Sequence, residues 1–287
     1  MGTKVMIFML GTLTVLLILL GVYGRTMDTK MLIFTPIISV ASGIFLLALY
    51  RSVANKLQGI WQQWRDTYTW SRDDLNTKAL IRAFVIEVVF QRKLYRDDRL
   101  RWARHIFIYW GFVGLWIFDG IFFFFTKILN LQPRHPFHLF LDFGLDLYGG
   151  VLLLGLSVAL IRAYFVRGSK GSIYNDTPAV SLLFVVTATG FFLEALRLVS
   201  VPYEPYMSWS FLGLALASAL GSLNWPWASV YEVTWIFHAV IASVSIAYIP
   251  LSRMVHIFAV PLGRLLESQQ EMLAVKIQSI GRGLMGK

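Results

Sequence analysis

The stretch Thr234-Trp-Ile-Phe-His238-Ala-Val-Ile-Ala-Ser-Val-Ser-Ile-Ala-Tyr-Ile-Pro250-Leu-Ser-Arg253-Met-Val-His256-Ile-Phe-Ala-Val-Pro261 decides the fold. It is an apolar run that carries two histidines, His238 and His256, eighteen residues apart. Eighteen residues make five helical turns, so both imidazoles share one helix face and are separated by about 27 Å of rise. That rise is close to the thickness of a bilayer's hydrocarbon core. The stretch therefore predicts a transmembrane helix with one histidine near each side of the membrane.

An imidazole inside a membrane is costly unless it has a partner. Two imidazoles on one helix face indicate a bound group on each side, and haem iron is the leading candidate. An interhelical hydrogen bond is the alternative for either histidine taken alone.

The composition also indicates a membrane protein, since 57% of the 287 residues are hydrophobic, 15% are charged and the mean hydropathy is +0.63. The segments long enough to cross a bilayer are 5–24, 31–50, 104–127, 138–161, 178–199 and 229–250. The first of these is interpreted as an uncleaved helix rather than a signal peptide. A shorter apolar segment, 211–223, predicts an interfacial or re-entrant helix. The predicted fold is all-α, a polytopic membrane helix bundle with about six transmembrane helices.

The distribution of lysine and arginine predicts the orientation. With the N-terminus inside, 21 of the 26 basic residues lie on the inner side, so both termini are predicted to be cytoplasmic in a multi-pass protein of the inner membrane. The net charge of +10 then reflects cytoplasmic loops next to membrane lipids, and it does not indicate nucleic-acid binding. Cysteine is absent, so any cysteine-ligated iron–sulfur cluster must belong to a partner.

These patterns divide the chain into four parts. Residues 1–54 hold two N-terminal transmembrane helices, 55–103 form a cytoplasmic loop with an amphipathic helix, 104–265 form a four-helix membrane domain for haem, and 266–287 form a cytoplasmic tail. The amphipathic segment, 78–98, could lie on the lipid surface or dock a cytoplasmic subunit, and the sequence favours neither.

The topology sorts the histidines by depth. His105 and His256 fall on the inner side, whereas His238 falls on the outer side together with His138, which heads the fourth predicted span. Two haems stacked across the membrane would then be held by His105 with His256 and by His238 with His138. His135 is the fallback for His138. Small residues on the third and fourth spans could make room for a macrocycle, namely Gly111, Gly114, Gly149 and Gly150.

Haem iron moves one electron at a time, so its function depends on what it connects, and a membrane quinone offers two electrons and two protons. Ionisable side chains within a span are functional candidates by default. The candidates for quinone binding in the outer half are Glu194, Arg197, Asp119, Lys127 and Glu232, with Asp142 and Asp146 as further carboxylates. Glu194 and Arg197 are the first choice, although residues three apart could simply pair along their helix. Lys127 could equally be a snorkelling interface residue.

The run from Phe237 to Pro261 resembles the last helix of the gamma subunit of respiratory nitrate reductase, in which two histidines with this spacing each ligate one b-type haem. Three upstream motifs are more similar to the membrane cytochrome subunits found beside heterodisulfide-reductase-like iron–sulfur proteins. They are Glu87-Val-Val-Phe-Gln-Arg-Lys-Leu-Tyr-Arg, Arg101-Trp-Ala-Arg-His105-Ile-Phe-Ile-Tyr-Trp-Gly-Phe and His135-Pro-Phe-His138.

The resemblance covers roughly residues 79–265 and has one departure. The nitrate reductase subunit carries two ligands ten residues apart on its second family helix, whereas ten residues after His105 stands Leu115. The resemblance therefore implies His105 with His256 as the inner ligands and His238 as an outer ligand, but it does not supply the partner of His238. The alternative is a single inner haem, with His238 serving quinone binding instead.

The implied function is that of a di-haem b membrane subunit of a respiratory oxidoreductase complex. It would transfer electrons between a membrane quinone of the menaquinone type and a cytoplasmic iron–sulfur subunit of the heterodisulfide-reductase type. Such a chain is an electron-transfer subunit and is not catalytic alone. The alternative is a haem-free or single-haem membrane anchor that recruits a cytoplasmic redox complex.

Overall fold

The computed structural model describes residues 36–51, 81–82, 84–165, 172–223, 225–252, 254 and 256–257. Every regular element within these ranges is a helix, as predicted. Four helices are long and apolar enough to cross a membrane, over Arg99–Thr126, Pro136–Phe165, Thr177–Val199 and Trp227–Tyr248. They correspond to the third to sixth predicted spans and confirm a multi-pass helical bundle. The second predicted span appears as the helix Pro36–Arg51, and the first lies outside the described residues.

The chain divides into two compact units, one made of residues 1–46 and 104–252 and the other of residues 47–103 and 253–287. The first unit contains most of α5 (Arg99–Phe123), the π-helix η3 (Phe124–Ile128), α6 (Pro136–Phe165), α7 (Ser172–Val199) and α9 (Trp227–Tyr248). Two short helices, η4 (Pro205–Trp209) and α8 (Phe211–Leu220), join α7 to α9. The predicted short helix at 211–223 is thus confirmed as a helix of 10 residues.

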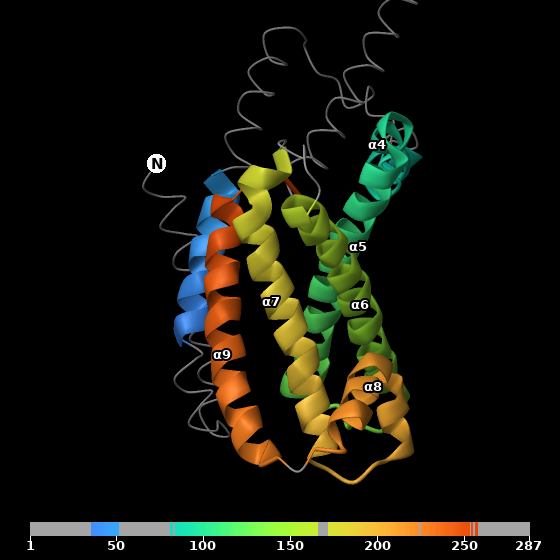
Figure 1. Cartoon of the computed structure of the whole chain (residues 1–287), viewed down its shortest axis with the longest axis vertical. Coiled ribbons are helices and arrows are strands. Elements are labelled where there is room, and N and C mark those ends of the chain that lie inside the picture. The colour runs from blue at the N-terminus through green and yellow to red at the C-terminus, as the bar shows by residue number, and fades with distance from the viewer. Residues whose placement is uncertain are drawn as a thin grey trace, which may run out of the picture. The chain divides into compact units, whose positions relative to one another are not determined.

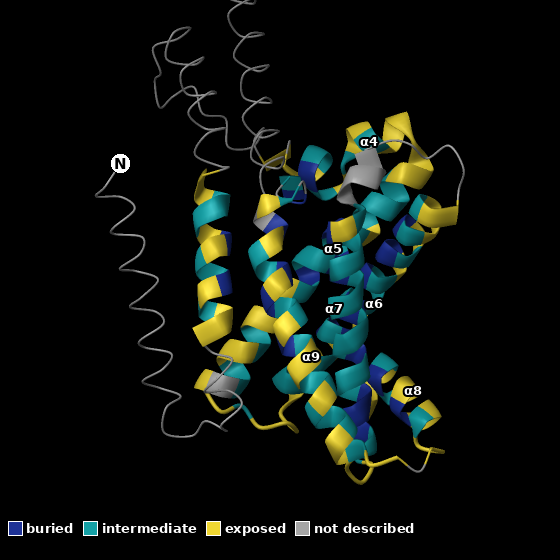
Figure 2. Cartoon of the chain, turned by 60° about the vertical axis from the view of Figure 1, so that its left-hand side comes forward, coloured by how far each residue is buried: buried dark blue, intermediate teal, exposed yellow. Residues whose placement is uncertain are grey.

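Helix α7 is central in the first unit because it contacts α6, α8 and α9 (Figure 1). The buried residues concentrate on α6 and α7 (Figure 2), and Leu152, Leu156, Ala195 and Leu196 have almost no exposed surface. Many large apolar side chains on α5 and α9 are exposed, as expected for helices that face lipid or other membrane helices. We call the end of this unit that holds α8 the α8 end.

Glycines bring α5 and α6 into backbone contact. A Cβ atom at Gly111 would press on the backbone of Leu152, and one at Gly155 would press on Ile108. Small residues allow such close approach between membrane helices. The four glycines that were expected to make room for a macrocycle all lie against other side chains or backbone. Gly111 and Gly114 pack against α6, Gly149 packs against the Phe191 ring and Gly150 packs against Leu212.

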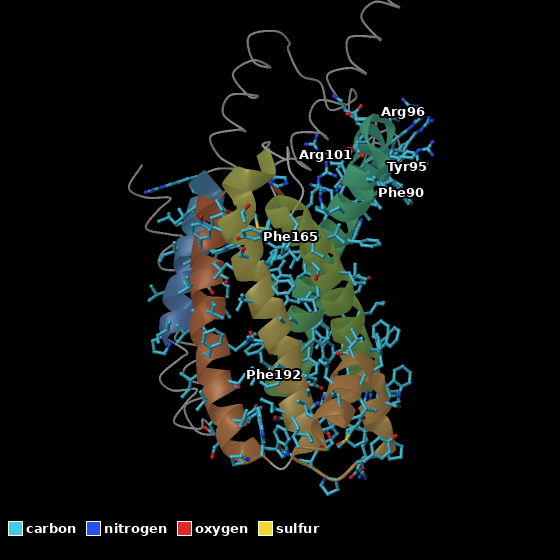
Figure 3. All side chains as sticks on the ribbon, in the orientation of Figure 1. Phe90, Tyr95, Arg96, Arg101, Phe165 and Phe192 are labelled. Atoms are coloured by element: carbon cyan, nitrogen blue, oxygen red, sulfur yellow. The ribbon has the colours of Figure 1, made fainter. Side chains whose placement is uncertain are left out.

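In the second unit, the amphipathic segment predicted at 78–98 is helical but interrupted. The π-helix η2 (Phe84–Val89) ends before α4 (Arg92–Asp97), and Gln91 between them has the left-handed φ of 49°. The indole N–H of Trp102 donates to the carbonyl of Phe90 at 2.8 Å, and the Trp102 ring meets Tyr95 edge-on. Figure 3 shows Tyr95 and Arg96 on α4.

Helix α5 begins five residues before the predicted span start at 104 because Asp98 caps it. The Asp98 carboxylate accepts the backbone N–H groups of Leu100 and Arg101, each at 3.0 Å. A side-chain acceptor at this position satisfies N–H groups that have no partner within the helix.

Candidate functional site

The α8 end contains a polar cluster between α6, α7 and α8. On α6, His138 Nδ1 lies 3.0 Å from a carboxylate oxygen of Asp142, one helical turn further along. Both side chains are nearly buried, with 12% and 13% of their surface exposed, and the ring of Phe122 on α5 packs edge-on against the imidazole. The predicted ligand His138 is therefore held in one orientation by its own helix.

Glu194 and Arg197 on α7 form a two-bond ion pair. The guanidinium donates to both carboxylate oxygens, at 3.0 and 2.6 Å. A Cβ atom at Gly213 would collide with the Glu194 side chain, so α8 lies directly over this pair. The structure thus adopts the pairing along the helix that was the plain alternative to quinone binding.

Asp146 on α6 caps α8. Its buried carboxylate accepts the backbone N–H of Leu212 at 2.6 Å and that of Gly213 at 3.3 Å. A carboxylate is favourable at a helix N-terminus because the free N–H groups and the helix dipole both attract a negative group. Asp146 therefore holds α8 against the bundle.

His238 lies near the middle of α9 and faces α7. Its Nδ1 is 2.8 Å from the Thr189 hydroxyl, and its ring packs beside Gly190. Sequence reasoning missed Thr189, although a threonine followed by a glycine in an apolar span is a pattern that leaves room for a neighbouring ring. The interhelical hydrogen bond that was the alternative to iron ligation is present.

His138 and His238 make their polar contacts with different neighbours. His238 meets the Thr189 hydroxyl on α7, whereas His138 meets Asp142 on its own helix. The pairing of the two histidines on one iron stays a prediction, and so does the fallback to His135.

The predicted inner ligands belong to different units. His105 belongs to the first unit. It lies near the start of α5 with its ring nearly parallel to that of Tyr109. His256 is half-buried and belongs to the second unit. Their pairing stays a prediction. The predicted continuous helix from His238 to His256 is wrong, because α9 ends at Tyr248, a 3₁₀ helix covers Ile249–Leu251 and Ser252 is extended.

The remaining candidates are dispersed. His135 is exposed before α6, and its Nδ1 accepts the backbone N–H of Phe137. Glu232 is half-buried on α9, and the side chain of Lys127 lies outside the described part of the structure. Asp119 lines a cavity on α5. Within the described ranges, no three histidine or carboxylate side chains converge on a common metal position.

The Glu194–Arg197 pair gives a first prediction. Arg197→Ala should lower the free energy of unfolding by about 1–2 kcal/mol, because it leaves the Glu194 carboxylate without its partner beneath α8. Adding Glu194→Gln should restore part of this loss, since no lone charge then remains. Thermal unfolding of the purified protein in detergent measures both effects.

The matched control is the exposed pair of Arg134 and Glu204, 2.5 Å apart, whose side chains are 73% and 40% exposed. Arg134→Ala should cost less than about 1 kcal/mol, as exposed ion pairs usually do. Equal losses of unfolding free energy in Arg197→Ala and Arg134→Ala would show that α8 does not shield the Glu194–Arg197 pair from solvent.

Comparisons with known proteins find relatives that match part of this chain. The chain is 30% identical over 195 residues to one subunit of the dihydromethanophenazine:CoB–CoM heterodisulfide reductase of Methanosarcina barkeri, and 29% identical to the same subunit from Methanosarcina thermophila. Each match covers 66% of this chain and 66% of the relative. The EtfAB:quinone oxidoreductase of Syntrophomonas wolfei is 26% identical over 186 residues, which are 59% of this chain and 25% of that protein.

No family model and no solved structure matches the chain. The similarity to the membrane subunits found with heterodisulfide reductases agrees with the relatives that the upstream sequence motifs indicated. The resemblance to the nitrate reductase gamma subunit has no counterpart among these matches.

Proposed function

We propose that this chain is the membrane electron-transfer subunit of an oxidoreductase complex and connects a lipid-soluble two-electron carrier to a cytoplasmic iron–sulfur subunit. The observation that carries this proposal is similarity, over about 190 residues, to two kinds of oxidoreductase. The name of one contains dihydromethanophenazine and that of the other contains quinone. Both words denote ring compounds that carry two electrons and two protons. Four long apolar helices place this chain where such a carrier dissolves.

The proposed carrier is a membrane quinone of the menaquinone type, and the proposed partner is an iron–sulfur subunit of the heterodisulfide-reductase type. The absence of cysteine in this chain supports a separate iron–sulfur protein. We place the chain in the inner membrane with both termini cytoplasmic, because the lysine and arginine bias favours that orientation.

Haem b is the cofactor that this function implies, and when bound it would carry single electrons. His105, His256 and His238 are the proposed ligands. His238 lies beside Gly190 and the Thr189 hydroxyl, so Thr189 would hold the imidazole in a fixed orientation, as an outer hydrogen bond does for a metal ligand. His138 is the proposed second ligand of the outer haem, with His135 as the fallback.

The test is a pyridine haemochrome assay on the purified protein, with spectra of the oxidised and dithionite-reduced forms. We expect two haems b per chain. His238→Ala should remove one of them, while His105→Ala or His256→Ala should remove the other. His138→Ala should remove the same haem as His238→Ala, whereas two remaining haems would rule out His138 and leave His135 as the second outer ligand to test. Protein without any haem would instead support a membrane anchor that recruits a cytoplasmic redox complex.

A further inference from the structure

Asp119 on α5 is a carboxylate within a membrane span that lacks a hydrogen-bond or ion-pair partner among the described residues. It is more than one-third exposed. The other carboxylates of the α8 end are satisfied, since Asp142 has His138, Asp146 has the α8 backbone and Glu194 has Arg197. A carboxylate at this depth is costly without a partner, so it indicates a bound group.

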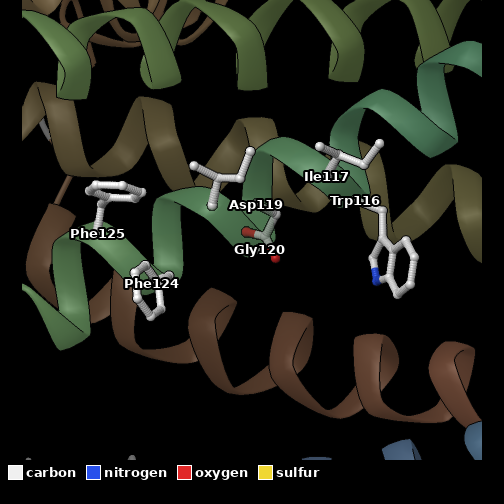
Figure 4. A pocket seen from close by; sticks show the side chains of 7 residues that line it. Trp116, Ile117, Asp119, Gly120, Phe124 and Phe125 are labelled. Carbon is white, nitrogen blue, oxygen red and sulfur yellow. The ribbon is translucent and has the colours of Figure 1, made fainter.

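A cavity of about 440 Å³ adjoins this carboxylate. Its lining includes Trp116, Gly120, Phe124 and Phe125, so Asp119 is the single ionisable group in an aromatic and aliphatic wall. Figure 4 shows the side chains of Trp116, Asp119 and Phe124 on the same side of the helix. The volume is in the range of small-molecule sites, which are mostly apolar with few polar groups.

The local backbone is arranged around this cavity. A Cβ atom at Gly120 would meet nothing within 4 Å, in contrast to Gly111 and Gly114 on the same helix, which pack against α6. Gly120 therefore keeps space open and does not serve helix packing. The π-helix η3 begins at Phe124, and π-helical turns inside or at the end of α-helices are frequent at functional sites.

We propose that this cavity binds the headgroup of the quinone, an inference that rests on the function proposed above. The flat ring lies against Trp116 and Phe124, whose faces offer stacking. The Asp119 carboxylate accepts a hydrogen bond from a hydroxyl of the reduced headgroup. The isoprenoid tail leaves through the open, apolar side of the cavity into the lipid.

Glu194 and Arg197 are less suited to this role, although they were the first choice from the sequence. Their charged groups bond to each other, and α8 lies over Glu194. A quinone there would have to break a two-bond ion pair and displace a helix. At Asp119 it would satisfy a carboxylate that otherwise has no partner in the described structure.

The test is photolabelling of the full chain, in its native membrane complex, with an azido-naphthoquinone, followed by trypsin digestion and mass spectrometry. The cavity residues all lie in the predicted tryptic peptide 105–127, whereas Glu194 and Arg197 lie in peptide 171–197. We expect the label in 105–127. Asp119→Asn should weaken naphthoquinol binding by about tenfold, through the loss of one charge-assisted hydrogen bond.

Gly120→Leu should abolish labelling because it fills the cavity while touching no packed neighbour. The matched control is Gly43→Leu, since a Cβ atom at Gly43 also meets nothing within 4 Å, and its labelling should equal that of the unmodified protein. Label in 171–197, or unchanged binding in both Asp119→Asn and Gly120→Leu, would overturn the proposed site alone. An unmodified complex that neither takes up label nor accepts electrons from a naphthoquinol would overturn the quinone-linked function as well.

Discussion

Asp146→Leu should release α8 from the bundle and lower the free energy of unfolding by about 2–4 kcal/mol. The buried carboxylate accepts two N–H groups from the first turn of α8, and leucine offers no acceptor. Two donors would then remain unpaired in apolar surroundings, where water cannot replace the lost acceptor. Thermal unfolding in detergent measures the stability change, and limited proteolysis between α7 and α9 detects the release of α8.

Asp146→Asn is the matched control, because one carboxylate oxygen accepts both N–H groups and the amide oxygen of asparagine can take its place. It should retain more than half of the stability that leucine loses. A loss in Asp146→Leu no larger than that in Asp146→Asn would mean that the hydrogen bonds to α8 contribute little. Since α8 covers Glu194, Asp146→Leu should also expose the Glu194 carboxylate to modification by a water-soluble carbodiimide.

Gly111→Leu should separate α5 from α6 and cost about 3 kcal/mol or more, at or above the upper end of the usual overpacking penalty. A Cβ atom at Gly111 would already overlap the Leu152 backbone, which cannot move aside as a flexible side chain can. Unfolding in detergent and the yield of monodisperse protein measure this effect.

Gly43→Leu and Gly120→Leu serve as controls for the larger side chain, because neither position has a neighbour within 4 Å of the added Cβ atom. Both should remain within about 1 kcal/mol of the unmodified protein, like most substitutions away from packed sites. If Gly111→Leu also stays within that range, the close approach of α5 and α6 is not required for the fold.

Gly111→Leu and Gly120→Leu should have different effects on stability and on quinone binding. Gly111 lies on the α6 side of α5, whereas a Cβ atom at Gly120, beside Asp119 in the cavity wall, would meet no neighbour within 4 Å. Gly111→Leu should therefore lower stability, whereas Gly120→Leu, on the same helix, should weaken quinone binding.

The sequence was sufficient for the spans and for the all-α class, because twenty or so consecutive apolar residues have few stable arrangements other than a membrane helix. It also predicted the short helix at 211–223 and the pairing of Glu194 with Arg197 as one of two options, since residues three apart always face each other on a helix. The break at Gln91 was not predicted, because a left-handed φ at a residue other than glycine leaves little signal in the sequence.

Only the tertiary structure decided which of these polar groups meet. Asp146 reaches the α8 backbone 66 positions later, and Thr189 on α7 meets His238 on α9. Periodicity places a residue on a face of its own helix, but distances between helices depend on where glycines let backbones touch and on which carboxylates find N–H donors. For this reason the sequence by itself determined the membrane helices and their candidate residues. The packing decided that Asp119, alone among the described carboxylates of the α8 end, lies beside an open cavity without a partner.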